Sequence, residues 1–326
     1  MRTITTAETA ARLPLEKDIL IMAHENPDGD ALGCVVALML MAERLGVPHR
    51  AYVPGETDFP AEYRFLPRLG EVLRGPFPPV APTTTAYILD CASAERLDAD
   101  GLRCAGDCLN IDHHQDNTGF GTLNLLDYAA ASTTQILFDV FTAGHLPIDP
   151  AIGTALYVGL TTDTGRFQYS NTTPAAHRMA AALQEAGVDV ARVAHRLYES
   201  MPLAKVRLLH KALGRLQLHL DGALVVSWLA GEDFAEAGAD ESATEGIIDT
   251  LRAIEGVRVA ALFRERTHDG RVEYKASLRA TDDGIDVAAL AHQRGGGGHV
   301  RAAGFTASAP LEDVLGWLVR EVGGRL

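Results

Sequence analysis

One stretch constrains the fold of this chain more than any other. The apolar run Ile19–Ala23 leads into a polar turn, and a long helical run follows from Ala31 to about Leu45. Because the apolar run is short, bounded and partly β-branched, it predicts a buried strand. The turn between them has the spacing H-x3-D-x-D, which places one imidazole and two carboxylates, those of His24, Asp28 and Asp30, between a strand and a helix.

This turn admits two interpretations. Ligands of open parallel α/β sheets bind at the carboxyl ends of the strands, where the turn lies. Hard divalent cations choose oxygen ligands, and Mn²⁺ also accepts imidazole, so the turn could hold a metal. Alternatively, Asp28 and Asp30 cap the helix, as Asp often does, and His24 is a polar residue at a strand end. The turn alone leaves both interpretations open.

Composition limits the class of protein. A length of 326 residues favours two domains, and 47% hydrophobic with 22% charged residues is typical of a soluble globular protein. The formal charge of −14 argues against a broad, non-specific nucleic-acid surface, but a small pocket for a phosphorylated ligand remains compatible with it. The four cysteines form no C-x-x-C pair. With no apolar leader and no run of roughly 20 apolar residues, we expect a cytoplasmic protein without a membrane partner.

The order of elements predicts an α/β fold. In the first half, strands alternate with helices, which indicates a parallel sheet with helices on both faces. The second half predicts a smaller mixed-sheet α/β domain. We expect a catalytic domain over 1–192, a helical connector over 193–216 and a second domain over 217–326. Expected strands lie at 47–53, 86–89, 108–111, 223–228, 257–264 and 272–279, and expected helices at 5–16, 131–143, 150–162, 172–184, 189–215, 241–254, 286–292 and 310–324.

Acids and imidazoles follow the predicted strands. Asp90 stands just past the strand at 86–89, and Asp112-His113-His114 just past the strand at 108–111. The ends of parallel strands meet at one sheet edge, so these side chains should converge with the turn described above. Asp163 adds a carboxylate from a Thr/Gly-rich turn. Several buried carboxylates need a compensating positive charge, which metal ions supply.

Four segments, HENPDGDALG, LDCAS, DHHQ and TTDTGRF, resemble in order and spacing the four motifs of the DHH phosphoesterases. The resemblance implies two Mn²⁺ ions per chain, with Mg²⁺ or Co²⁺ as substitutes. His24 and Asp28 would bind the first ion. Asp30, His114 and Asp163 would bind the second, and Asp90 would bridge the two. His113 would orient the site or touch the phosphate, and Asp112 would hold a histidine tautomer.

A glycine run marks the second domain. Residues 295–304 read GGGGHVRAAG, in which backbone N–H groups, His299 and Arg301 could surround an anion. Such a run could also be a flexible linker. It resembles the GGGH motif of the DHH-associated substrate-binding domain, which implies substrate contacts for Gly297 and Gly298. Residues 275–280, KASLRA, resemble the S-L-R-S segment of that domain, with Ala where Ser is common, so Arg279 and the nearby Arg264 become candidate phosphate contacts.

Three further candidates remain open in the first domain and the connector. Ser132 and Thr133 stand at a helix start, where they could cap the helix or contact substrate. Arg166 could face a substrate phosphate or pair with a surface acid. The helix over 193–216 is basic and could bind nucleic acid, but we favour a connector with a solvated face.

The resemblance implies hydrolysis of a phosphoester by water activated between two ions. In length and plan the chain is similar to the nanoRNase and pAp-phosphatase branch, which acts on short RNA or DNA oligonucleotides, dinucleotides and 3′-phosphoadenosine 5′-phosphate (pAp). The alternatives are a cyclic-di-AMP or linear-dinucleotide phosphodiesterase, a RecJ-like single-strand exonuclease, or a nucleotide-binding module without catalysis. We expect no stable binding of long duplexes, and a homodimer is left open.

Overall fold

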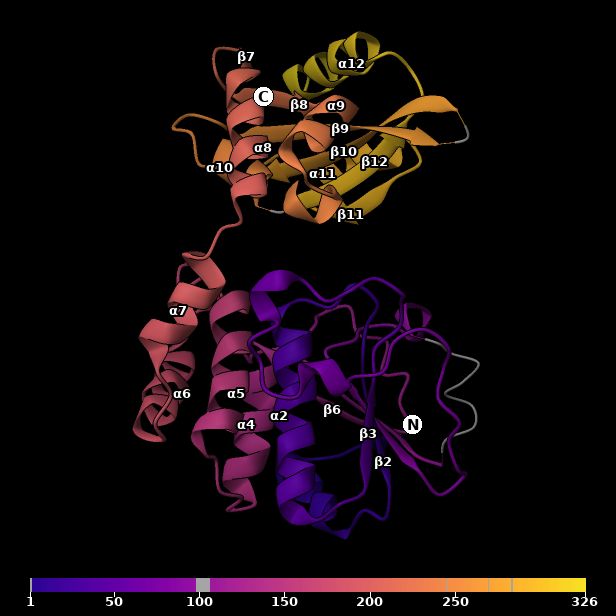
Figure 1. The fold of residues 1–326 in the computed structure, drawn as a ribbon, viewed down its shortest axis with the longest axis vertical. Coiled ribbons are helices and arrows are strands. Elements are labelled where there is room, and N and C mark those ends of the chain that lie inside the picture. The colour runs from indigo at the N-terminus through magenta and orange to yellow at the C-terminus, as the bar shows by residue number, and fades with distance from the viewer. Residues whose placement is uncertain (1, 98–105, 245, 269, 283) are drawn as a thin grey trace. The chain divides into compact units, whose positions relative to one another are not determined.

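The chain divides into two compact units. The computed structural model describes residues 2–97, 106–244, 246–268, 270–282 and 284–326. Its units are Met1–Ser200 and Met201–Leu326 (Figure 1). The predicted connector spans the end of the first unit and the start of the second. The prediction of a single helix over 189–215 was wrong in its middle, where the structure has two separate helices, α7 (Val190–Tyr198) and α8 (Leu203–Gly214). They are separate because Pro202, just before α8, cannot continue a helix that precedes it.

The first unit is built on a six-stranded parallel sheet. Its strand order is β1-β6-β5-β4-β2-β3, and every neighbouring pair is parallel. The predicted strands are confirmed within a few residues, whereas β1 and β6 escaped prediction. The strands are β1 (Arg2–Thr3), β2 (Ile19–Ala23), β3 (His49–Tyr52), β4 (Thr85–Leu89), β5 (Cys108–Asp112) and β6 (Leu123–Leu126).

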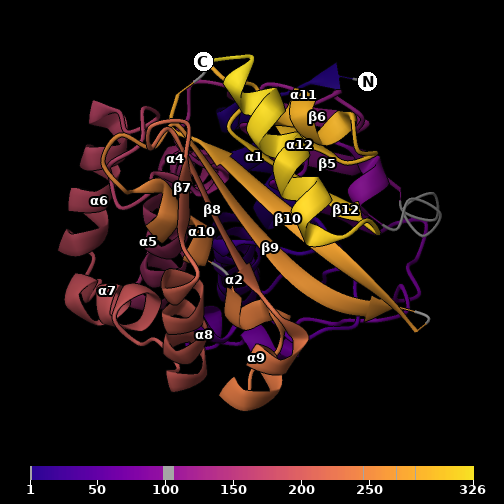
Figure 2. The same ribbon diagram turned by 90° about the horizontal axis from the view of Figure 1, so that it is seen from above.

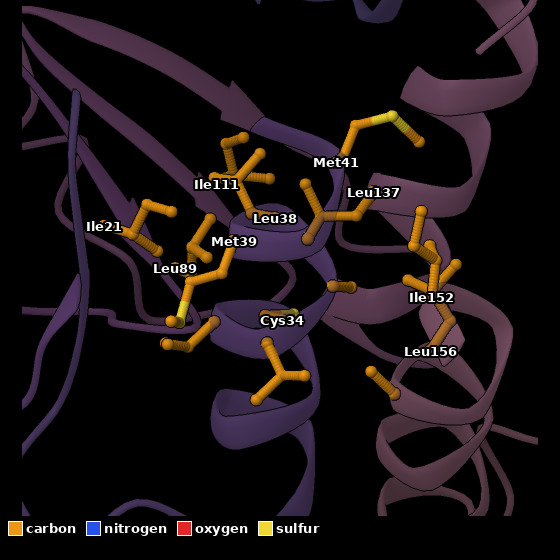
Figure 3. Packing of buried hydrophobic residues seen from close by; sticks show 14 of the residues in the cluster. Ile21, Cys34, Leu38, Met39, Met41, Leu89, Ile111, Leu137, Ile152 and Leu156 are labelled. Carbon is orange, nitrogen blue, oxygen red and sulfur yellow. The ribbon is translucent and has the colours of Figure 1, made fainter. Parts of the chain in front are cut away.

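Helix α2 (Gly29–Leu45) is the centre of the first unit. Asp28 caps its first turn by accepting hydrogen bonds from the backbone N–H groups of Asp30 and Ala31, and Gly46 ends it in the left-handed conformation. Figure 3 shows the helix between the strands and other helices of the unit, with Ile21 on the sheet side and Leu156 on the other. Because it is covered on both sides, apolar residues occupy most of its surface.

The remaining helices of the first unit are α1 (Thr6–Arg12), α4 (Thr133–Ala143), α5 (Pro150–Asp163), α6 (Pro174–Glu185) and α7. We predicted helices on both faces of this sheet. Among the described residues, the buried apolar side chains of these helices and of α2 instead belong to one core, on one face of the sheet. The described residues that pack on the other face, among them Phe77, Val80 and Phe120, come from irregular segments.

The second unit has a mixed six-stranded sheet in the order β11-β12-β10-β9-β8-β7, in which only β8 and β9 pair in parallel (Figure 2). Its two faces carry separate cores, one against α11 and α12 and the other against α8, α9 and α10. The elements after α8 are β7 (Gln217–His219), β8 (Leu224–Leu229), α9 (Gly231–Ala237), α10 (Ile247–Arg252), β9 (Val259–His268), β10 (Arg271–Ala280), α11 (Val287–His292), β11 (Gly297–His299), β12 (Ala302–Ala307) and α12 (Leu311–Gly323).

Within the described ranges, every helix is too short or too polar to cross a lipid bilayer.

Candidate functional site

The sheet of the first unit brings the predicted acids and imidazoles to one edge. His24 directly follows β2, Asp90 directly follows β4, and Asp112 ends β5. Since β4 lies between β2 and β5 and all three are parallel, these ends are neighbours. Asp30 enters from the first turn of α2, and Asp163 is the last residue of α5.

Three groups of side chains lie close enough to hold metal ions. In each group the ligand atoms are within 4.8 Å of one another. His24 Nε2 lies 3.8 Å from Asp90 Oδ2, and His113 Nε2 lies 3.8 Å from Asp90 Oδ1 and 3.4 Å from Asp163 Oδ2. The groups are His24, Asp28 and Asp90; Asp90, His113 and His114; and Asp30, His113 and Asp163.

The groups differ from the sequence-based assignment in one member. We expected His114 beside Asp30 and Asp163, but the group with those two acids contains His113. His114 lies instead with Asp90, at 3.6 Å from Nδ1 to Oδ1. Adjacent residues leave a strand end in different directions, so motif spacing alone does not decide which of two neighbouring histidines faces a given acid. Asp90 belongs to two groups, as a bridging ligand would.

Asp90 is held in an unusual backbone conformation. Its φ is +56°, in the left-handed region that non-glycine residues enter at a cost, and its residue surface is 1% exposed. Thr133 Oγ1 donates a hydrogen bond of 2.9 Å to Asp90 Oδ1. The backbone turn and this hydrogen bond together aim the carboxylate at the neighbouring imidazoles.

The N-terminus of α4 holds Asp30. The backbone N–H of Thr133 donates to Asp30 Oδ2 (2.6 Å), and Thr134 donates to Oδ1 through its N–H (3.0 Å) and its hydroxyl (2.7 Å). The positive end of the helix dipole favours a carboxylate there. Oδ1 thus accepts these two hydrogen bonds and a long one from Cys34 Sγ (4.0 Å), whereas Oδ2 accepts one, which leaves an electron pair of Oδ2 for an ion.

Ser132 and Thr133, expected to cap the helix or to contact substrate, are both fully buried. Ser132 is the N-cap of α4 and accepts a hydrogen bond from the backbone N–H of Gln135. Neither side chain is accessible to a substrate in this structure. Arg166 is exposed, and its guanidinium carbon lies 3.9 Å from the centroid of the Tyr198 ring.

A network of buried polar groups orients His114. The ring N–H of His114 donates to Asp112 Oδ1 (2.7 Å), and Asn117 Nδ2 donates to Asp112 Oδ2 (2.5 Å). Asn117 also donates to Asn110 Oδ1 (2.8 Å). The hydrogen bond to Asp112 fixes Nδ1 as the protonated nitrogen and leaves the Nε2 lone pair unprotonated. Sequence reasoning placed Asp112 in this role but missed both asparagines, because a lone Asn carries no motif.

Arg96 is a second residue that the motifs did not reveal. It lies in the short helical turn Ala94–Arg96, and its Nη2 is 2.7 Å from His24 Nδ1. The carbonyl of Glu25 lies 2.7 Å from the same ring nitrogen. His24 therefore has its Nδ1 edge enclosed by these two groups, and it turns Nε2 toward Asp90.

The carboxylates at this edge share too little space to be charged without a counter-ion. Burial, and then the neighbouring carboxylate of Asp30, raises the pKa of Asp90 far above its usual value. Burial raises the pKa of Asp30 as well. Burial, and then Asp30 and Asp28, raises the pKa of Asp163 to about 8. Clustered carboxylate oxygens and imidazole nitrogens are a donor set that suits Mn²⁺, and the positive charge would compensate these acids.

The second unit carries a separate cavity of about 620 Å³. The candidate substrate contacts Arg279, Gly297 and Gly298 line it, and so do Lys275 and Arg294, which the motifs did not single out. The glycine run forms strand β11, paired with β12, so the linker interpretation was wrong. His299 and Arg301 are exposed and are not among the residues that line the cavity.

Glycine is required in that wall. A Cβ atom at Gly296 would lie 2.1 Å from the carbonyl oxygen of Gly304, and Gly298 has a φ of +141°. Arg294 at the rim packs with its guanidinium carbon 4.4 Å from the centroid of the Trp317 ring. The cavity therefore combines a close backbone wall with three cationic side chains, a combination that suits an anionic ligand.

Comparison with known proteins finds a matching domain family for each half of the chain. Residues 18–160 match the DHH family, N-terminal domain, and residues 221–322 match the DHHA1 domain. A bifunctional oligoribonuclease and PAP phosphatase NrnA from Thermus thermophilus is 34% identical over 292 residues, which are 90% of this chain and 85% of the relative. A probable bifunctional oligoribonuclease and PAP phosphatase NrnA from Streptococcus mutans is 27% identical over 93% of this chain and 94% of its own length.

A solved structure shares the fold. The crystal structure of an exopolyphosphatase-related protein from Bacteroides fragilis matches with a TM-score of 0.86 at 21% identity, covering 98% of this chain and 95% of the other. With both domains matched and a relative that is 34% identical over most of its length, the chain belongs to the DHH family of phosphoesterases and carries a DHHA1 domain after its DHH domain.

Proposed function

We propose that this phosphoesterase is a Mn²⁺-dependent hydrolase of very short oligonucleotides, dinucleotides and pAp, with two ions per chain. The observation that carries the proposal is the convergence of four acids and three imidazoles from separate segments into groups whose ligand atoms lie within 4.8 Å. The names of the relatives from Thermus thermophilus and Streptococcus mutans support the choice of substrates.

His24, Asp28 and Asp90 would hold one ion, and Asp30, His113 and Asp163 the other. Asp90 would contribute to both ions, and His114 would belong to the site through its proximity to Asp90. When bound, the ions would supply positive charge to the phosphoryl oxygens and lower the pKa of a water molecule. Asp112 keeps His114 in one tautomer, Thr133 orients Asp90, and α4 orients Asp30. Arg96 would hold the Nδ1 edge of His24.

The second unit would bind the remainder of the substrate. Lys275, Arg279 and Arg294 line a cavity large enough for one nucleotide, together with the glycine run. Arginine recognises phosphate through paired N–H groups, and lysine adds a point charge. Given the net charge of −14, this local cluster favours short substrates over long strands, which need an extended basic surface.

The test is product release from a panel of pAp, RNA and DNA of two to five nucleotides, long single strands and cyclic di-AMP. Mn²⁺, Mg²⁺ and Co²⁺ are compared with chelator, using wild type, Asp163→Asn and the surface control Asp58→Asn. We expect Mn²⁺-dependent turnover of pAp and the shortest oligonucleotides, lost in Asp163→Asn and retained in Asp58→Asn.

The other outcomes separate the alternatives. Preference for cyclic di-AMP would make the protein a cyclic-dinucleotide phosphodiesterase, and preference for long strands would make it an exonuclease. Binding of nucleotides without turnover under any metal would leave a binding module and refute the proposal. Fractionation of cells that express the chain would test the predicted cytoplasmic location, and light scattering would test whether it forms a homodimer.

A further inference from the structure

An acid, Glu241, lies among the cations on one face of the second unit. Lys275, Ser277 and Arg279 alternate along β10 and therefore project from the same face of the sheet. Arg264 lies directly opposite Lys275 on the antiparallel neighbour β9, so it shares that face. Glu241, from the short helical turn Glu241–Thr244, reaches over these strands.

Glu241 contacts three cations at once. Its Oε1 lies 3.5 Å from Arg264 Nη1 and 3.7 Å from Lys275 Nζ, and its Oε2 pairs with Arg266. Oε1 is buried and accepts no hydrogen bond from the described residues. It is thus attracted by Arg264 and Lys275 without being tightly bound to either, which is the arrangement of a counter-ion between charges.

This acid borders the cavity proposed for substrate. Lys275, one of its partners, lines the cavity. Arg264, another partner, donates a hydrogen bond of 2.6 Å to Ser277, which also lines it. Arg279 lies further along the same strand, 4.0 Å from Asp249. A phosphate that approached Lys275 and Arg279 would enter the field of the Glu241 carboxylate.

We infer that Glu241 is an internal competitor for the substrate phosphate, which lowers the affinity of the cationic face and thereby favours product release. The inference rests on the proposed function, because it concerns the same cavity. With phosphate absent, the carboxylate offsets the mutual repulsion of Arg264, Arg266 and Lys275. With phosphate present, its charge opposes binding or its side chain moves away from Lys275.

The experiment measures inorganic phosphate and adenosine 5′-monophosphate binding to the full chain in chelator, by calorimetry. Glu241→Gln keeps the size of the side chain and one acceptor oxygen, replaces the other oxygen by an amide NH2, and removes the charge. Glu255→Gln, at an exposed acid of the same unit, makes the same change in net charge. We expect Glu241→Gln to bind phosphate about three- to tenfold more tightly, a screened single-charge effect, and Glu255→Gln to stay near wild type.

Turnover separates this role from a structural one. With Mn²⁺ present, Glu241→Gln should lower KM and leave kcat equal or lower, whereas loosened packing would raise KM and lower the melting temperature. Glu241→Asp, which keeps the charge, should bind phosphate no more tightly than wild type. Thermal melting of each variant verifies that it is folded.

The inference is overturned if Glu241→Gln binds phosphate equally or more weakly while Arg279→Ala removes the binding. That result would leave the cavity as the substrate site. Phosphate binding that is insensitive to Arg279→Ala would overturn both the inference and the proposed role of the cavity.

Discussion

Asp90 combines deep burial, a left-handed backbone and close approach to three imidazoles. The left-handed backbone is strained, and the burial costs free energy in the metal-free protein because a buried carboxylate among other carboxylates is poorly solvated. A residue that destabilises its own fold in this way is best explained by a ligand that repays the cost. The destabilisation can be measured separately from catalysis.

The first prediction concerns that cost. Asp90→Asn should raise the melting temperature of the metal-free protein by a few degrees, since it removes about 1 kcal/mol or more of carboxylate repulsion and Asn tolerates the left-handed conformation. It should also abolish high-affinity Mn²⁺ binding. Differential scanning fluorimetry in chelator and calorimetry with Mn²⁺ test both statements. A lower metal-free melting temperature than wild type would contradict the repulsion argument.

The second prediction concerns pH. Asp163 has a pKa of about 8 in the folded protein and an ordinary acidic pKa when unfolded, so the folded state binds the extra proton between these values. Stability of the metal-free protein should therefore fall as pH rises toward 8, and Asp163→Asn should flatten the fall above pH 7, where most histidines are already neutral. Melting curves in chelator from pH 7 to 9 measure it. Equal slopes in the two proteins would contradict the assignment.

At the scale of elements, the first turn of α4 supports the sheet edge at which the candidate metal ligands gather. The backbone and hydroxyl groups of this turn donate hydrogen bonds to Asp30 and to Asp90. Ser132, the N-cap, accepts a hydrogen bond from the helix backbone. One helix terminus thereby orients two carboxylates that come from different strands and helices. Such supporting contacts change ligand affinity without supplying a ligand.

Thr133→Val tests this support. It keeps the shape and removes the hydroxyl that donates to Asp90 Oδ1, so Mn²⁺ affinity should fall about tenfold. Thr142→Val, at an exposed position of the same helix, should have no such effect. Competition with a fluorescent Mn²⁺ chelator gives the affinities. A wild-type affinity in Thr133→Val would show that the hydroxyl is not needed.

Close packing of α5 on α4 and α2 gives the fourth prediction. A Cβ atom at Gly159 would lie 2.4 Å from Thr134 Cγ2 and 2.5 Å from Asp30 Oδ1. Gly159→Ala should therefore cost about 1–3 kcal/mol of stability, measured by urea unfolding, and weaken Mn²⁺ binding. Gly316→Ala, in the interior of α12 where only Arg320 lies within 4 Å, should stabilise by up to about 1 kcal/mol. Destabilisation by both variants to the same extent would contradict the packing argument.

The sequence predicted the long and apolar elements well and the short ones poorly. β2 is a continuous apolar run, β4 and β5 are mostly apolar, and α2 has a cap at each end, so local pattern sufficed. β1 and β7 have two and three residues, too few for a pattern, and exist because a neighbour pairs with them. The motif residues could be placed at one edge by topology, but the side on which His113 and His114 face depends on the local backbone. Asn117, Arg96 and Arg294 became visible only through their contacts.

At the scale of the molecule, opposite charges gather in different units. The first holds the clustered acids beyond β2, β4 and β5, and the second holds Lys275, Arg279 and Arg294 around its cavity. The formal charge of −14 is thus an average over two very different local fields. Removal of charge from one unit should leave the function of the other measurable.

The fifth prediction uses this division. The double variant Lys275→Ala, Arg279→Ala should raise KM for pAp about ten- to hundredfold, because it removes phosphate contacts made before and during the reaction. Its Mn²⁺ affinity should match that of wild type. Steady-state kinetics and Mn²⁺ calorimetry supply the two numbers. A loss of Mn²⁺ binding in this variant would mean that Lys275 and Arg279 act on the candidate metal ligands of the first unit.

The candidate ligands run from His24, in the turn after β2, to Asp163, at the end of α5. No ribosome-bound intermediate that stops short of α5 can assemble the complete centre, however much of the sheet it has formed. The centre would thus be complete only after most of the first unit has emerged, near the middle of the 326-residue chain. A nascent chain that stops before the end of α5 would lack Asp163, and the order of the segments would itself delay phosphoesterase activity until its scaffold is built.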